Sequence, residues 1–182
     1  MRAIRNVVLL LATAAAATIP AALPATAAPA AAPRSAETTS SCTGGVVISG
    51  NVADGGCKTA AELAALPQRT IAISFNTPTG RETHTFTGPL LLDVLTAAHP
   101  RFATSNPNDK LRYAVLANAS DGAQVTVAWG EFDPDGADKA ILLALGQDGQ
   151  PLAAPRLGIP IEKTGGRDLA GVCSLRVGRP LL

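Results

Sequence analysis

Hydrophobic and polar residues alternate along several short stretches between residues 46 and 177, a pattern typical of half-buried β-strands. The clearest is Thr70–Phe75, where isoleucine or phenylalanine stands at every second position. The turn residues Pro78–Gly80 follow, so Glu82–Phe86 is expected to return as the second strand of a hairpin. Further strands are expected at residues 46–49, 111–117, 124–128, 140–145, 157–161 and 172–177.

Helices are predicted at only a few places. Thr59 and Glu62 have the spacing of a capping box, in which each side chain accepts from the other residue's main-chain N–H. They predict a helix over residues 60–66, and a second helix is expected over residues 90–98. Residues 129–132 are expected to form a helical turn. About eight strands with two short helices and short connections predict an α+β, mostly β domain, with a mixed sheet or a pair of sheets.

The beginning of the chain has the pattern of an export signal. Two arginines precede the apolar stretch Val7–Ala17, and small residues lead to an A-x-A site that predicts cleavage after Ala27. An uncleaved anchor is the alternative, which the lack of a stop-transfer pattern disfavours. Residues 28–41 are rich in Ala, Pro, Ser and Thr and are expected to be a disordered tether before a domain at 42–182. We therefore expect a secreted or extracytoplasmic protein that is free of the membrane after cleavage.

The amino-acid composition bears on which kind of macromolecule the protein could bind. The 182 residues carry 15 Lys plus Arg against 14 Asp plus Glu, and 3% are aromatic. A nucleic-acid-binding protein would show a basic surface and a high pI. The near balance of charge therefore argues against nucleic acid as a partner. The sequence does not indicate an oligomeric state or a substrate.

Three cysteines allow one disulfide and one remaining thiol. An oxidising location makes a disulfide expected, and we favour Cys42–Cys57, which closes a local loop around the first strand. The alternative, Cys57–Cys173, would join the two ends of the domain, and the sequence alone does not decide between them. With the favoured pairing, Cys173 is expected to be a small buried residue in its strand.

Catalytic motifs are scarce. Only two histidines are present, His84 in a strand and His99 at a helix end, and no G-x-S-x-G motif accompanies them. His99 is interpreted as a residue that interacts with the helix dipole. The densest acidic cluster lacks the spacing of a calcium loop and is interpreted as solvated turn acids. Its members are Glu131, Asp133, Asp135 and Asp138.

A basic segment near the end of the chain is the better candidate for a site. Arg156, Lys163 and Arg167 lie on it, with a Gly165-Gly166 pair between the last two. Flexible glycines beside cations let main-chain N–H groups approach an anion, and an arginine fork suits an oxyanion. The alternative is that the three cations are solvated charges that prevent sheet edges from aggregating, and residue chemistry alone favours that alternative.

Several segments follow one another in a recognisable order: Val47–Val52, Thr59–Pro67, Phe86–Leu95, Ala119–Gly122 with Glu131-Phe132, Pro155–Pro160 and Gly166-Arg167. This order resembles the molybdopterin-binding domain of the sulfite oxidase family, especially its short exported members. The resemblance spans residues 46–177 and rests on order and spacing rather than on one motif. It implies that family's α+β fold and a molybdopterin cofactor.

One position departs from the family pattern. Catalytic members place a molybdenum-binding cysteine in the stretch that corresponds to Phe75–Gly80, where this chain has Asn76 and no cysteine. A carboxamide cannot replace the soft thiolate. The larger catalytic members also have a longer chain and often a dimerisation domain. The resemblance carries over an anion site in which Arg156 and Gly166-Arg167 are expected to face a pterin phosphate. Lys163, from the basic segment, and Asn76 complete the set of expected cofactor-binding residues.

The sequence therefore predicts an exported single-domain protein that binds a pterin-like or other anionic small ligand and has no catalytic or metal-binding residues. Two alternatives stay open. One is a molybdopterin-dependent oxidoreductase whose metal is held only by the pterin. The other is an extracellular interaction domain without a cofactor.

Overall fold

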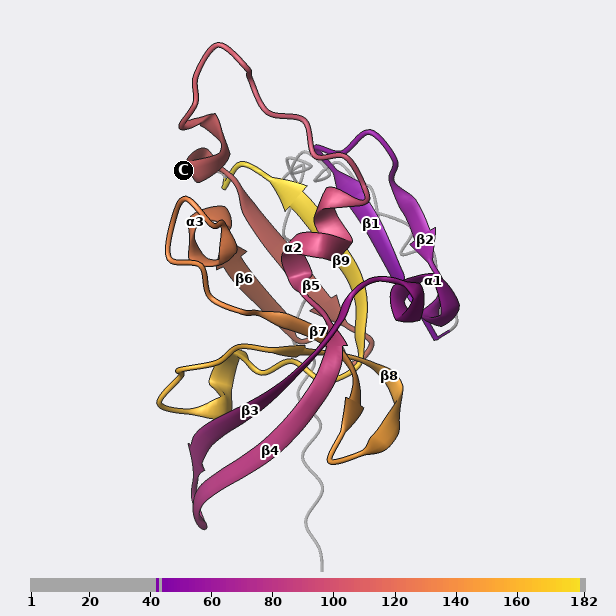
Figure 1. Cartoon of the computed structure of the whole chain (residues 1–182), viewed down its shortest axis with the longest axis vertical. Coiled ribbons are helices and arrows are strands. Elements are labelled where there is room, and N and C mark those ends of the chain that lie inside the picture. Colours follow the sequence, from indigo (N-terminus) through magenta and orange to yellow (C-terminus); the bar gives the residue numbers. More distant parts are fainter. Residues whose placement is uncertain (1–41, 43, 181–182) are drawn as a thin grey trace, which may run out of the picture. The chain divides into compact units, whose positions relative to one another are not determined.

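The computed structural model describes residues 42 and 44–180 (Figure 1). The expected signal peptide and tether lie outside the described residues. In the described part of the chain, no helix has the length and apolar character needed to cross a membrane. The described residues form two β-sheets with a few short helices, which confirms the mostly β fold with mixed strand pairing.

The first sheet has five strands, in the order β2-β1-β9-β5-β6. Their bounds are β1 Val46–Gly50, β2 Gly56–Lys58, β5 Ala114–Ala119, β6 Gln124–Ala128 and β9 Val172–Gly178. The pairing of β1 with β9 is parallel, with Val47 beside Ser174, whereas the other pairs are antiparallel. Inward-facing residues such as Ile48, Val115 and Leu175 are fully buried, so one face of this sheet builds the main core.

The second sheet has four antiparallel strands, in the order β3-β4-β7-β8. Their bounds are β3 Gln68–Thr77, β4 Gly80–Pro89, β7 Leu142–Gln147 and β8 Gln150–Gly158. The expected β3–β4 hairpin is present, and its strands are longer than the stretches of alternating residues that predicted them. Main-chain pairing extends without a break to Gln68 and Pro89. Asp148 and Gly149 both have positive φ and form the tight turn between β7 and β8, so β8 begins earlier than predicted.

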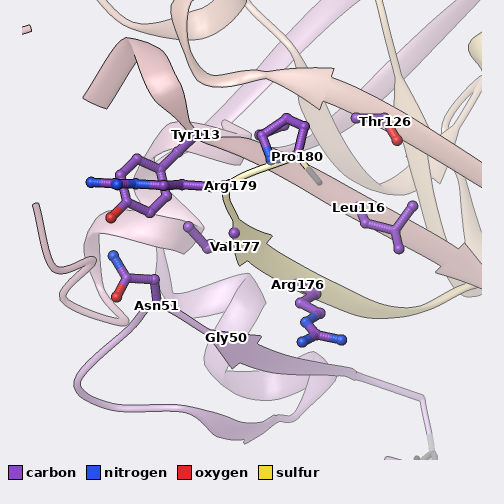
Figure 2. Close-up of a pocket in the computed structure, with 11 residues that line it drawn as sticks. Gly50, Asn51, Tyr113, Leu116, Thr126, Arg176, Val177, Arg179 and Pro180 are labelled. Atoms are coloured by element: carbon purple, nitrogen blue, oxygen red, sulfur yellow. The ribbon is translucent and has the colours of Figure 1, made fainter. Parts of the chain in front are cut away.

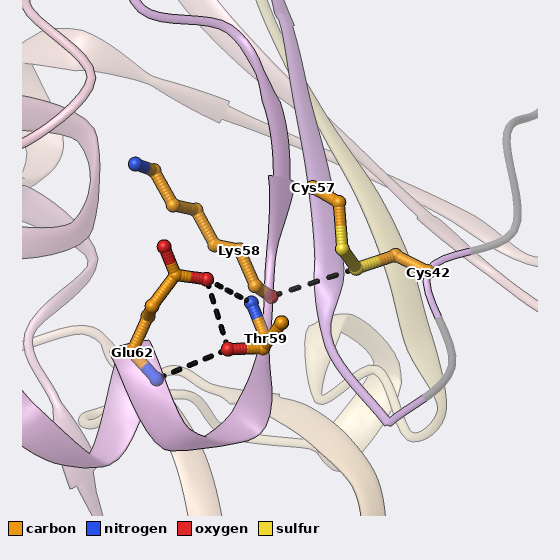
Figure 3. The surroundings of a disulfide bond; sticks show 5 residues. All are labelled: Cys42, Cys57, Lys58, Thr59 and Glu62. Carbon is orange, nitrogen blue, oxygen red and sulfur yellow. Dashed lines mark hydrogen bonds between the residues drawn. A yellow bond between two sulfur atoms is a disulfide. The ribbon is translucent and has the colours of Figure 1, made fainter.

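The helices are short and lie between the strands. They are α1 Ala60–Ala65, α2 Leu91–Thr96 and α3 Trp129–Phe132, with 3₁₀ turns η1 Asp109–Arg112 and η2 Gly165–Arg167. The predicted capping box is confirmed: the Thr59 hydroxyl accepts from the Glu62 N–H at 3.2 Å, and the Glu62 carboxylate accepts from the Thr59 N–H at 2.7 Å (Figure 3). The second helix is shorter than predicted because the chain turns at His99, where φ is 50°.

The disulfide joins Cys42 to Cys57, as favoured from the sequence (Figure 3). It attaches the beginning of the described chain to β2, at the edge of the five-stranded sheet. Cys173 is the free cysteine and is only partly buried in β9, where its thiol lies 3.4 Å from the main-chain oxygen of Asn118. A disulfide of this kind is favoured in an oxidising compartment, which agrees with an extracytoplasmic location.

Candidate functional site

The predicted anion-binding residues are distributed around the end of β3, β8 and the loop that contains η2. The Asn76 N–H donates to the main-chain oxygen of Lys163 at 3.1 Å, and Asn76 also forms a bridge with Thr164. Both Asn76 and Lys163 are exposed. The fold therefore brings together two predicted residues that are 87 positions apart in the sequence, through main-chain contacts that leave both side chains accessible.

Arg156, on β8, already binds a carboxylate. Its Nε donates to Asp168 Oδ1 at 2.7 Å and one Nη donates to Asp168 Oδ2 at 3.2 Å, a two-point contact. The Asp168 side chain is only 4% exposed. The guanidinium also lies 5.3 Å from the centre of the Phe86 ring. An external anion at Arg156 would therefore compete with a nearly buried carboxylate that is covalently part of the same chain.

Arg167, at the end of η2, is held by two carboxylates. It donates to both oxygens of Glu131, at 3.1 and 2.7 Å, and to Glu162 at 2.7 Å. The hydrogen bonds that Arg167 donates to Glu131, and then the one it donates to Glu162, raise the pKa of Arg167. In return, the hydrogen bonds from Arg167 are the largest cause that lowers the pKa of Glu131 to about 2. This cluster joins η2 to α3, so Arg167 has a structural contact that the sequence did not indicate.

The interpretation of the acidic cluster as solvated turn acids is wrong for two of its members. Glu131 pairs with Arg167, and Asp133 is 3% exposed. Asp133 accepts from Lys110 Nζ at 2.7 Å and from Trp129 Nε1 at 2.8 Å. Burial acts to raise the pKa of Asp133, but these hydrogen bonds outweigh burial and the pKa lies below its ordinary value. These two acids therefore fix α3 from within the fold.

The other two members of that cluster agree with the interpretation, since Asp135 and Asp138 are exposed. Asp135 also receives a hydrogen bond from Lys110 at 2.6 Å. Within residues 42 and 44–180, no group of three or more His, Cys, Asp or Glu side chains is placed to hold a metal ion.

His84 belongs to a polar network that sequence reasoning missed. Its Nδ1 lies 2.7 Å from Asp148 Oδ2 and 3.2 Å from Gln147 Nε2, and its Nε2 lies 3.5 Å from Glu82. The hydrogen bond with Asp148 is the largest cause that raises the pKa of His84. Gln147 also accepts from Arg156 at 3.4 Å, so the network extends across β4, β7 and β8. Only the strand register, which the sequence did not provide, brings these groups together.

His99 has a side-chain partner as well as its position at a helix end. Its Nδ1 lies 2.7 Å from Asp54 Oδ2, and both side chains are largely exposed. An exposed pair of this type contributes little to stability.

The cavity shown in Figure 2 lies elsewhere, on the outer side of the five-stranded sheet. Its volume is about 670 Å³, and none of the four predicted site residues lines it. Arg179 stacks over the Tyr113 ring there, 5.1 Å from the ring centre, and also donates to Asp109 at 2.9 Å. Arg179, one of the two arginines that line this cavity, is therefore engaged by the chain itself.

Comparison with known proteins adds information about the fold. No protein-family model matches the chain, and no curated protein matches it in sequence. One similar solved structure is the sulfane dehydrogenase SoxCD from Paracoccus pantotrophus, with a TM-score of 0.58 and 15% sequence identity. The match covers 73% of this chain but only 37% of that chain, so this chain spans little more than a third of that protein's length. At this identity the match shows that the two chains share a fold.

Proposed function

We propose that this chain is a non-catalytic binding module built on the molybdopterin-binding fold of the sulfite oxidase family. The fold similarity to a dehydrogenase supports the resemblance drawn from the order of sequence segments. The Cys42–Cys57 disulfide supports an exported, extracytoplasmic protein.

The observation that carries the proposal is the chemistry at Asn76. This residue stands where catalytic members of the family place a thiolate, and a neutral carboxamide is a poor ligand for a metal that prefers soft sulfur. None of the chain's cysteines replaces that thiolate: Cys42 and Cys57 are joined to each other, and Cys173 lies on β9 in the other sheet. The residues present therefore do not fit a molybdenum centre.

An anionic small ligand, pterin-like or otherwise, is the occupant that fits the loop after β8. Lys163 offers an exposed ammonium, and the neighbouring Asn76 offers an exposed carboxamide. Arg156 and Arg167 would join them only by exchanging a carboxylate partner for the ligand. This competition predicts modest affinity and no tightly held group, in keeping with a binding module rather than a cofactor-dependent enzyme.

Metal and pterin analysis of the protein secreted by its native host tests the proposal. We expect no stoichiometric molybdenum, and finding it would refute the non-catalytic assignment. If pterin is extracted, the retained amount should fall in Lys163→Ala and stay unchanged in Arg101→Ala, an exposed cation on the loop after α2. Equal retention in both variants would refute the placement of the anion site. Absence of both molybdenum and pterin would favour an interaction domain without a cofactor.

A further inference from the structure

The outer edge of β3 presents main-chain groups that have no partner within residues 42 and 44–180. β3 is the edge strand of the four-stranded sheet and lies on the far side of β4 from β7 (Figure 1). The Asn76 N–H points away from β4, because it donates to Lys163. Main-chain direction alternates along a strand, so Thr70, Ala72 and Ser74 point outward as well. Among the residues that the structure describes, the outward main-chain groups of these three residues have no hydrogen-bond partner.

This edge also lacks the features that usually block pairing with another strand. β3 contains no proline, and its register with β4 is continuous over ten residue pairs, so no bulge interrupts it. Arg69 is its only charged residue. Natural edge strands are usually short, charged, bulged or covered, since an open edge is a template for another strand. A long, regular and nearly uncharged edge is therefore expected to have a partner.

The sequence of the edge indicates which partner. Thr70-Ile71-Ala72-Ile73-Ser74 reads almost the same in both directions, with a hydroxyl residue at each end and alanine at the centre. A two-fold interface requires a surface that is complementary to itself. We propose that β3 pairs in antiparallel fashion with β3 of a second copy of this chain, with Ala72 on the two-fold axis.

In this register the outward main-chain groups match. Ala72 faces Ala72 of the partner subunit, and Thr70 faces Ser74 of the partner subunit. Because all of these residues direct both main-chain groups outward, each pairing forms two N–H···O=C hydrogen bonds. The two four-stranded sheets would then form one continuous eight-stranded sheet.

Side chains match on both faces of the pairing. On the polar face, Thr70 and Ser74 already bond to hydroxyls of β4, at 3.0 and 2.7 Å, so the new contact extends an existing row of hydroxyl pairs. On the other face, the partly buried Ile71 stands opposite Ile73 of the partner subunit, a residue that is already buried in the core of its own chain. The two copies of Arg69 lie at opposite ends of the pairing, about 20 Å apart, and do not repel strongly.

The open stretch is bounded symmetrically. At one end, the Gln68 side chain donates to carbonyl groups at the end of α1, including Leu66 O at 2.8 Å. At the other end, Asn76 bonds to the loop after β8. Each boundary is four residues from Ala72, so the free edge is centred on the proposed axis. This dimer does not depend on the proposed function, since neither a ligand nor a cofactor takes part in it.

Sedimentation velocity of the secreted protein tests the dimer. We expect the mass to double with rising concentration, and Ala72→Lys to weaken dimerisation by at least about tenfold, because two like charges would meet on the axis. Thr85→Lys is the matched control, because Thr85 is the exposed neighbour of Ala72 on β4 but does not lie on the edge. It should dimerise like the unmodified chain. A monomer at all concentrations, or a dimer that Ala72→Lys leaves intact, would overturn the proposal.

Crosslinking gives a second readout that does not rely on weakening the interface. In a Cys173→Ser background, Ala72→Cys should form an intermolecular disulfide on mild oxidation, because hydrogen-bonded antiparallel pairs hold Cα atoms about 5.5 Å apart. Thr85→Cys should stay uncrosslinked under the same conditions. Equal crosslinking of both variants, or of neither, would contradict the proposed register.

Discussion

Glu131 is expected to stabilise the fold only while it is ionised. Its carboxylate accepts hydrogen bonds from Arg167, from the Ala128 N–H at 3.1 Å and from Lys139 at 3.3 Å. The Arg167 contact is the largest cause that lowers the pKa from 4.5 to about 2. Because the folded pKa is lower than the unfolded one, the contribution is complete above the unfolded pKa and is lost as pH falls through the folded pKa. The shift corresponds to about 3 kcal/mol of stability at neutral pH.

Glu131→Gln removes the charge and keeps the shape of the side chain. We expect a loss of about 3 kcal/mol in the free energy of unfolding at pH 7, which shrinks to about 1 kcal/mol at pH 3, because below pH 4.5 the carboxylate of the unfolded chain is protonated while that of the folded chain stays largely ionised. Urea denaturation at a series of pH values measures the difference. The chain's single tryptophan, Trp129, is buried beside Glu131 and provides the fluorescence signal.

Asp138→Asn is the matched control, because Asp138 is an exposed acid in the same segment. Its effect should stay within about 0.5 kcal/mol and show no trend with pH. A loss in Glu131→Gln that is equal at pH 3 and pH 7 would refute the electrostatic reasoning. So would an unchanged stability at pH 7, because the ion-paired cluster would then contribute nothing.

Three further perturbations test other parts of the fold. Cys57→Ser opens a disulfide between cysteines 15 residues apart and should lower the free energy of unfolding by about 3 kcal/mol, measured by chemical denaturation; an unchanged midpoint would contradict this. Arg156→Met should lower the free energy of unfolding by about 3 kcal/mol, because it leaves the nearly buried carboxylate of Asp168 unpaired. Adding Asp168→Asn should recover part of this loss. If the effects of the two substitutions simply add in this double-mutant cycle, the ion pair does not stabilise the fold. Gly88→Ala should lower the free energy of unfolding by about 2 kcal/mol or more, because a Cβ there would collide with the main chain of β7. Gly178→Ala should leave stability nearly unchanged, because open space surrounds that position. Equal shifts of the melting temperature in the two variants would contradict this.

Local signals in the sequence predicted local structure well. The capping box of Thr59 and Glu62 was found as expected, because both partners lie within one helical turn. The β3–β4 hairpin follows from alternating residues on both sides of a two-residue turn. The Cys42–Cys57 pairing closes a short loop and was the favoured choice. In each of these cases the interacting residues are close in sequence, so few alternative partners competed.

Partners distant in sequence could not be predicted. Glu131 and Arg167 are 36 residues apart, and only the packing of η2 near α3 makes them neighbours. Arg156 and Arg167 were predicted to bind an anion because each is a cation with no evident partner nearby in the sequence. The carboxylates that pair with them come from positions that only the fold brings close. The buried position of Asp133 has the same origin, since its partner Lys110 precedes it by 23 residues. The sequence shows which residues are charged, whereas the arrangement of strands and helices determines which of them form ion pairs.

The position of β9 constrains when the chain can fold. The last described strand, β9, lies between β1 and β5, so residues 172–178 form the centre of the five-stranded sheet. A nascent chain that still lacks residues 172–178 possesses only two separate hairpins, β1–β2 and β5–β6, with no strand to join them. Isolated two-stranded hairpins are marginally stable in water. This sheet can therefore become complete only after residues 172–178 have been synthesised, although its other four strands lie at 46–58 and 114–128.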